Sequence, residues 1–127
     1  MVALALLLPS SPAEAQIAPQ TKVSSLSEVI HQEADKNAIN ADLALEIANC
    51  ESGVRQFNSD GSVLQGKLHP PDTGVFQINK KVHLETAQKL GYDLDTSLGN
   101  IGYAMYLLKN EGTKPWSASQ TCWDKVK

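Results

Sequence analysis

Apolar residues recur three and four positions apart in four segments of the chain, and residues that favour helix ends flank each segment. Such spacing places the apolar side chains on one face of an α-helix. Ser25-Leu-Ser-Glu28 has the form of a capping box, and a glycine follows each of the last three segments. The predicted helices run from Ser25 to about Asn37, from Asn40 to Ser52, from Lys80 to Leu90, and from Thr96 or Ser97 to just before Gly112.

A strand is predicted in the middle of the chain, where polar and apolar residues alternate. In Asp72-Thr-Gly-Val-Phe-Gln-Ile-Asn79, Gln77 and Asn79 alternate with apolar neighbours, which gives the strand one polar and one apolar face. We expect the polar face to look into a cleft. The turn sequence Asn58-Ser-Asp-Gly61 lies ahead of this strand and indicates a hairpin. Together the patterns predict a mainly α-helical α+β domain with a small antiparallel β-sheet.

Glu51 falls in the last turn of the second predicted helix, on the side that carries its apolar residues. A carboxylate on this side loses hydration, and the partial negative charge at a helix C-terminus opposes its ionisation, so both effects raise its pKa. A glutamic acid with a raised pKa is suited to donate a proton as a general acid. The alternative is a helix-end glutamate that turns to solvent or pairs with Arg55.

The pair Glu51 and Ser52 at a helix end, followed by a small sheet and by Gly74-Val-Phe-Gln-Ile-Asn79, resembles the lysozyme-like superfamily. Both C-type lysozymes and lytic transglycosylases of the SLT type share this arrangement, and the resemblance covers roughly residues 40–123. It implies a lysozyme-like catalytic domain at residues 25–127 that cleaves the β-1,4 bond between MurNAc and GlcNAc in peptidoglycan.

The resemblance also implies roles for individual residues. Glu51 would protonate the glycosidic oxygen, while Ser52, Gln77 and Asn79 would hold the sugars near it. The implied chemistry needs no metal and no organic cofactor. The alternative function is a noncatalytic peptidoglycan-binding or envelope-assembly module, although a pure binding protein has no need for an acid on an apolar helix face.

Asp72 decides between two kinds of cleavage. In C-type lysozymes an aspartate opens the motif that residues 72–79 resemble, and it acts there as nucleophile or charge stabiliser. Transglycosylases typically lack this aspartate and let the 6-hydroxyl of the substrate capture the cation. Pro70-Pro71 ahead of Asp72, and an interval from Glu51 longer than C-type lysozymes generally show, both speak against the lysozyme role. Hydrolase and transglycosylase therefore both stay open.

Two further residues are candidate substrate contacts. Asn100-Ile101 followed by Tyr103 is similar to the helix that backs the active site in the transglycosylase family; the alternative is a core helix in which Asn100 satisfies backbone groups. Trp116 is a candidate because aromatic faces stack on sugar rings. For each tryptophan the alternative is packing in the core, which we favour for Trp123.

The N-terminus and the cysteines indicate export. Residues 1–15 combine a short apolar run with Ala13-Glu-Ala15, a pattern that precedes signal-peptide cleavage, although the usual basic start is missing. Residues 16–24 form a short leader. An even count of two cysteines in an exported chain favours a disulfide between Cys50 and Cys122. We therefore expect a protein that is secreted or held in the cell envelope, with no stable membrane insertion after signal cleavage.

Composition narrows the possible partners. A length of 127 residues with 42% apolar residues fits one small domain with a core, which we expect to be a monomer. The formal net charge is −3 and the basic residues are scattered, so no nucleic-acid partner is indicated and the expected partner is the glycan strand of peptidoglycan. His31, Glu33 and Asp35 are interpreted as a solvated helix face, and no metal site is predicted.

Overall fold

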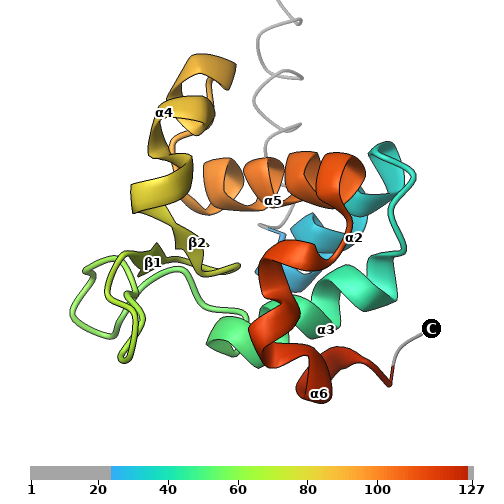
Figure 1. Ribbon diagram of the computed structural model, residues 1–127, viewed down its shortest axis with the longest axis horizontal. Helices are drawn as coiled ribbons and strands as arrows, with labels where there is room; N and C mark the ends of the chain where they lie inside the picture. The colour runs from blue at the N-terminus through green and yellow to red at the C-terminus, as the bar shows by residue number, and fades with distance from the viewer. Residues whose placement is uncertain (1–23, 126–127) are drawn as a thin grey trace, which may run out of the picture.

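Helices make up most of the part of the chain that the computed structural model describes, residues 24–125 (Figure 1). Two short antiparallel strands form the one sheet found in these residues. The predicted class, a mainly helical α+β domain with a small antiparallel sheet, is therefore confirmed. In chain order the elements are α2 (Leu26–Lys36), α3 (Ala41–Ser52), β1 (Asp72–Thr73), β2 (Ile78–Asn79), α4 (Lys80–Leu90), α5 (Ser97–Glu111), the 3-10 helix η3 (Lys114–Ser119) and α6 (Gln120–Trp123).

The four predicted helices are present, and their capping residues act as expected. Ser25 and Glu28 form the capping box at the start of α2. The side chain of Asn40 caps α3 by accepting a hydrogen bond of 3.1 Å from the backbone N–H of Leu43. Gly53 ends α3 with a φ of 68°, a left-handed conformation that glycine adopts without a steric penalty. Helix α3 therefore ends immediately after Glu51 and Ser52.

The predicted single strand is wrong, because residues 72–79 form a tight hairpin. Strands β1 and β2 pair so that Asp72 lies opposite Asn79. Between them the backbone takes left-handed values at Gly74, with φ of 76°, and at Gln77, with φ of 50°. The alternation of polar and apolar residues could not reveal this reversal, because a non-glycine residue such as Gln77 rarely adopts a positive φ.

Two buried amide side chains hold this hairpin against the helices. Asn100 of α5 accepts a hydrogen bond of 2.9 Å from the backbone N–H of Phe76 and donates one of 2.9 Å to the carbonyl of Thr73. Gln56 accepts a hydrogen bond of 3.0 Å from the backbone N–H of Val75. Both amides also donate to the carbonyl of Leu94, at 3.0 and 3.1 Å. The backbone groups of the turn are thus satisfied by side chains instead of by a wider sheet.

The long segment between α3 and β1 lies beside the hairpin and bears the predicted turn. The backbone N–H of Asn58 donates to the carbonyl of Ser62 at 2.8 Å, and Phe57 and Val63 form an isolated antiparallel bridge around that turn. A second bridge joins Gln65 to β1. This segment therefore extends the small sheet on one side, as the green trace next to β1 in Figure 1 shows.

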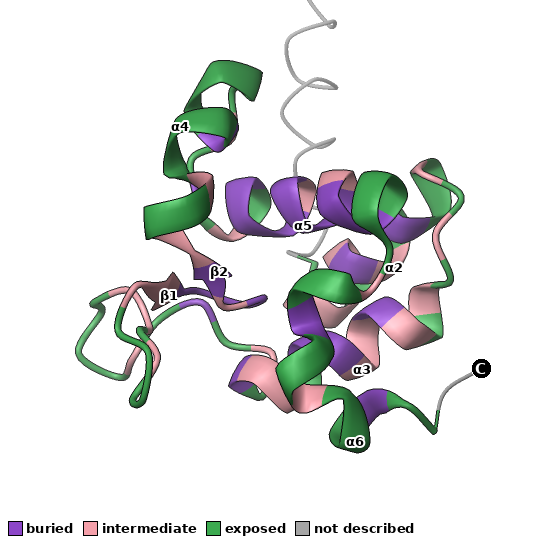
Figure 2. Ribbon diagram, viewed as in Figure 1, coloured by how far each residue is buried: buried purple, intermediate pink, exposed green. Residues whose placement is uncertain are grey.

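Helix α5 is the most buried element of the fold (Figure 2). It lies across the domain between α4 on one side and α2 and η3 on the other, and its buried residues include the predicted core stripe Ile101, Ala104, Met105 and Leu108. Both tryptophans join this core, with exposed fractions of 3% for Trp116 and 4% for Trp123.

Cys50 and Cys122 form the predicted disulfide, which is confirmed. It joins the last turn of α3 to α6 across a sequence separation of 72 residues, and the two Cα atoms lie 6.1 Å apart. Closing a loop of this length stabilises a fold by about 4 kcal/mol in the chain-entropy account. The bridge therefore fixes the C-terminal segment next to the helix end that carries Glu51.

The expected signal peptide at residues 1–15 and all of the expected leader except Ser24 lie outside the described residues. Among the residues that are described, no helix combines the length and apolar character that crossing a bilayer requires.

Candidate active site

Glu51 lies half buried in the last turn of α3, where the C-terminal segment of the chain covers it. Its Oε2 accepts a hydrogen bond of 2.5 Å from the hydroxyl of Ser119. The indole N–H of Trp123 donates to the same hydroxyl oxygen at 3.1 Å, and that hydroxyl also lies 3.2 Å from the carbonyl oxygen of Trp116. The carboxyl group of Glu51 is thus held by a hydroxyl that also accepts a hydrogen bond from Trp123.

The surroundings of Glu51 raise its pKa above the ordinary value of a glutamate. Burial is the largest cause, the hydrogen bond from Ser119 opposes it, and the negative charge of Asp72 adds to the rise. Pairing with Arg55, the alternative that the sequence left open, is not found: Glu51 is in no ion pair of the described residues, and the Nε–H of Arg55 donates instead to the carbonyl of Ser52 at 3.0 Å. A carboxyl group in this setting keeps its proton to a higher pH.

Glu51 and several other sequence candidates line one cleft, with a cavity volume of about 350 Å³. We call this cavity the Glu51 cleft. Helix α3, the hairpin, the start of α4 and η3 all contribute to it. The predicted site residues that line it are Glu51, Asp72, Gln77, Asn79 and Trp116.

Asp72 opens β1 at the wall of the Glu51 cleft. Burial raises the pKa of Asp72, and the neighbouring His69 partly offsets that rise. Because the charge of Asp72 contributes to the raised pKa of Glu51, the two carboxyl groups interact. Both pKa values are raised, so each carboxyl group keeps its proton to a higher pH than an exposed one does.

Gln77 and Asn79 line the cleft from the hairpin, although not as neighbours on one strand face. The side-chain N–H of Gln77 donates to the carbonyl of Gly74 at 2.9 Å, which stabilises the turn. The side-chain oxygen of Asn79 accepts from the backbone N–H of Lys81 at 2.9 Å and so caps α4. One hydrogen-bonding group of each amide is therefore used within the protein, in the hairpin turn for Gln77 and in the cap of α4 for Asn79, and the other remains for a ligand.

Ser52, Tyr103 and Trp116 are more deeply placed than a direct sugar contact requires. The hydroxyl of Ser52 donates to the carbonyl of Val75 at 2.7 Å and ties α3 to the hairpin. Tyr103 is 1% exposed, and its hydroxyl lies 2.8 Å from Nδ1 of His83. Trp116 donates its indole N–H to the carbonyl of Phe76 at 2.9 Å. These three side chains position the cleft from behind, and only Trp116 is also among its lining residues.

Two residues of the candidate site could not be singled out from the sequence as easily. His83 lines the Glu51 cleft and bonds to Tyr103, but a single histidine in a helix carries no distinguishing pattern. Ser119 contacts Glu51 directly. A signal for Ser119 was present, because it lies one helical turn before Cys122, and the predicted disulfide places Cys122 next to the residue that precedes Glu51.

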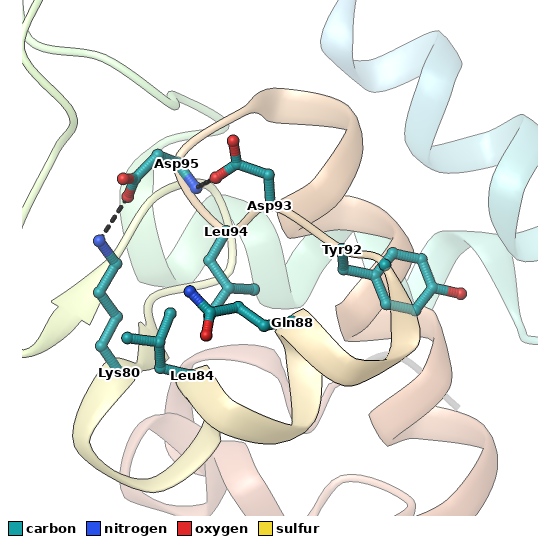
Figure 3. A pocket seen from close by; sticks show the side chains of 8 residues that line it. Lys80, Leu84, Gln88, Tyr92, Asp93, Leu94 and Asp95 are labelled. Carbon is teal, nitrogen blue, oxygen red and sulfur yellow. Dashed lines mark hydrogen bonds and ion pairs between the residues drawn. The ribbon is translucent and has the colours of Figure 1, made fainter.

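A larger cavity of about 440 Å³ lies away from Glu51, between α4 and the segment that leads into α5 (Figure 3). One face of α4 lines it with Lys80, Leu84 and Gln88. Lys80 forms an ion pair of 2.5 Å with Asp95, which also lines the cavity. The carboxylate of Asp93 is also occupied, because it accepts the backbone N–H of Asp95 at 3.0 Å. Its charges are therefore satisfied within the protein, and size alone does not make it the reactive site.

Across residues 24–125, no group of three or more histidine, cysteine, aspartate or glutamate side chains is arranged to hold a metal ion. No family model matches the chain, and neither a curated protein nor a solved structure is found to be similar to it. The candidate site therefore stands on its own geometry.

Proposed function

We propose that this protein is an exported enzyme that cleaves the β-1,4 glycosidic bond between MurNAc and GlcNAc in peptidoglycan. The observation that carries the proposal is the setting of Glu51: a half-buried carboxyl group with a raised pKa, oriented by Ser119 at the wall of a cleft. A general acid needs a proton at the working pH and a fixed direction in which to deliver it. The substrate class comes from the resemblance of residues 40–123 to lysozymes and lytic transglycosylases.

Glu51 donates its proton to the glycosidic oxygen as the bond breaks, which leaves positive charge on the sugar ring. Gln77 and Asn79, on the hairpin that lines the same cleft, bind hydroxyl or amide groups of the sugars and hold the bond next to Glu51. Partial burial of the acid lowers the local dielectric constant and strengthens these interactions.

Asp72 is the group that assists this reaction from across the cleft. Ionised Asp72 stabilises the positive charge on the sugar ring, while Glu51, whose pKa its charge raises, retains the proton. In a hydrolase Asp72 would act as nucleophile or charge stabiliser; in a transglycosylase the 6-hydroxyl of the substrate would capture the cation. The products distinguish the two, because a hydrolase releases reducing ends and a transglycosylase releases 1,6-anhydro ends.

Export to the cell envelope is part of the proposal and is supported by the disulfide between Cys50 and Cys122. Disulfides form and persist in oxidising compartments outside the cytoplasm, where peptidoglycan is also found.

The test is mass spectrometry of sugars released from purified peptidoglycan by the wild-type protein and by Glu51→Gln. The amide keeps the shape of the side chain but cannot deliver the proton, so release should fall by roughly 10²- to 10⁴-fold. Glu46→Gln is the matched control, because it is the same substitution on the same helix at a residue that does not line the cleft. Unchanged release by Glu51→Gln would refute the assignment, and peptidoglycan binding without any release by the wild type would favour the noncatalytic module.

A further inference from the structure

A third cavity, of about 330 Å³, adjoins the Glu51 cleft. It is lined by Arg55, Gln65, Gly66 and Lys67, and it shares Glu51 and Gln77 with the Glu51 cleft. We call it the cationic hollow. Because the two cavities meet at the proposed acid, a chain that lies in the Glu51 cleft can continue past Glu51 into the cationic hollow.

The two cavities differ in charge. The Glu51 cleft has Asp72 as its second carboxyl group, whereas the charged residues that line the cationic hollow are Arg55, Lys67 and Glu51. Neither Arg55 nor Lys67 forms an ion pair with any residue that the structure describes. Two cations without an ion-pair partner among the described residues therefore line one cavity of a protein whose formal net charge is −3.

Arg55 is oriented for an anion. Its backbone N–H donates to the hydroxyl of Ser52 at 3.0 Å, and its Nε–H donates to the carbonyl of Ser52 at 3.0 Å. The second bond fixes the guanidinium group through its inner nitrogen, and the terminal nitrogens keep their hydrogens for a ligand. A guanidinium group binds a carboxylate through two parallel hydrogen bonds, which gives direction as well as attraction.

Lys67 belongs to a segment that the hairpin holds in place. The backbone N–H of Gly66 donates to the carbonyl of Asp72 at 2.9 Å. Gly66 also packs so closely that a Cβ atom there would lie 2.5 Å from the carbonyl oxygen of His69, which only a glycine avoids without a shift. The backbone that carries Lys67 is therefore positioned by the sheet, although the side chain itself is exposed.

We propose that the cationic hollow binds a carboxylate attached to the glycan strand, so that this protein selects acidic, substituted strands over neutral ones. The inference rests on the proposed function and adds the substrate class for that site. Peptidoglycan offers two sources of this chemistry: the carboxylates of its short peptides, and the lactyl carboxylate that is free where a peptide has been removed. A neutral β-1,4 glycan such as a chitin oligosaccharide has neither group and would leave Arg55 and Lys67 unpaired.

The experiment measures binding, so that it does not depend on turnover. Calorimetry with Glu51→Gln protein compares three oligosaccharides of equal sugar number: a peptide-bearing glycan, the same glycan freed of its peptides, and a chitin oligomer. Arg55→Gln and Lys67→Gln, each added to that background, should weaken binding of the charged oligomers by roughly threefold to tenfold. The loss should be smaller at raised salt concentration and smallest for the chitin oligomer. Lys89→Gln, at an exposed position on α4 outside both cavities, is the control and should change none of the three affinities.

The peptide is the bound group if the loss is larger for the peptide-bearing glycan. The lactyl carboxylate is the bound group if the loss is larger for the glycan freed of its peptides, because an attached peptide converts that carboxylate into a neutral amide. Equal losses for the charged and the neutral oligomers, or no loss for any of them, would overturn the proposal. The outcome is separate from that of the proposed function. If the protein binds in a charge-dependent way but releases no sugar, cleavage is rejected and carboxylate binding by the cationic hollow stands. If it releases sugar but its affinities do not depend on Arg55 and Lys67, cleavage stands and carboxylate binding by the cationic hollow is rejected.

Discussion

The hydroxyl of Ser119 donates a hydrogen bond of 2.5 Å to Oε2 of Glu51, although 68 residues separate the two in the chain. The disulfide between Cys50 and Cys122 holds the same two segments together, since Cys50 directly precedes Glu51 and Cys122 follows Ser119 by one helical turn. The last elements of the chain, η3 and α6, therefore act as part of the candidate active site. They bury the acid, and they also supply the hydrogen bond that orients it.

Ser119→Ala should lower activity and raise the pKa of Glu51 further, because the lost hydrogen bond stabilises the ionised carboxylate. We expect a loss of roughly tenfold in kcat/KM from poorer orientation, together with a shift of the alkaline limb of the pH profile to higher pH. The measurement is kcat/KM against pH. Ser117→Ala, at an exposed position of the same 3-10 helix, is the control. A loss of rate with an unshifted profile would mean that Ser119 acts on packing alone.

Asp72→Asn should move the same limb in the opposite direction. Removing the negative charge of Asp72 lowers the pKa of Glu51, so the limb shifts to lower pH. We expect a loss of about 10- to 100-fold in rate, smaller than that of Glu51→Gln, since Asp72 assists and does not supply the proton. Mass spectrometry of the products completes the test: anhydro ends with nearly full activity in Asp72→Asn would show that the lysozyme-like role of Asp72 is wrong.

Glu51→Gln should stabilise the folded protein at neutral pH. The pKa of Glu51 is raised on folding, so the stability linked to its protonation is complete below the unfolded pKa and is lost as the pH rises through the folded pKa. The neutral amide avoids this loss. Thermal unfolding at pH 7 should give a Tm higher by roughly 2–4 °C than that of the wild type, and the difference should vanish at low pH. A Tm difference that does not change with pH would show that ionisation of Glu51 is not its cause.

Cys122→Ala should destabilise the fold and loosen the acid. The bridge constrains a long loop of the unfolded chain, so its loss should lower the free energy of unfolding by about 2–4 kcal/mol in denaturant titrations. Activity should fall more steeply with temperature than in the wild type, because Ser119 ends η3 and directly precedes α6, which the bridge anchors. Labelling of the denatured, unreduced wild-type protein checks the premise, and two reactive thiols in material from an oxidising compartment would contradict it.

The local sequence determined where the helices begin and end. The helix ends are set by local contacts, made by Ser25 with Glu28, by Asn40 and by Gly53. These contacts join residues only a few positions apart, so they do not depend on the rest of the fold. For the same reason, the position of Glu51 in the last turn of α3, on its apolar side, could be predicted from periodicity alone. The disulfide could be predicted because two cysteines allow a single pairing.

Tertiary structure decided the rest of the candidate site. The hairpin reverses at Gln77 because Asn100 and Gln56, from distant segments, satisfy the backbone groups of its turn, and no pattern within residues 72–79 shows those partners. Ser119 meets Glu51 because packing and a covalent bond bring two helix ends together. The raised pKa of Glu51 depends on how much protein covers it, and the positive charge beside it depends on which cations the neighbouring loop carries there. Each of these features depends on contacts between residues that lie far apart in the chain, and only the folded structure brings those residues together.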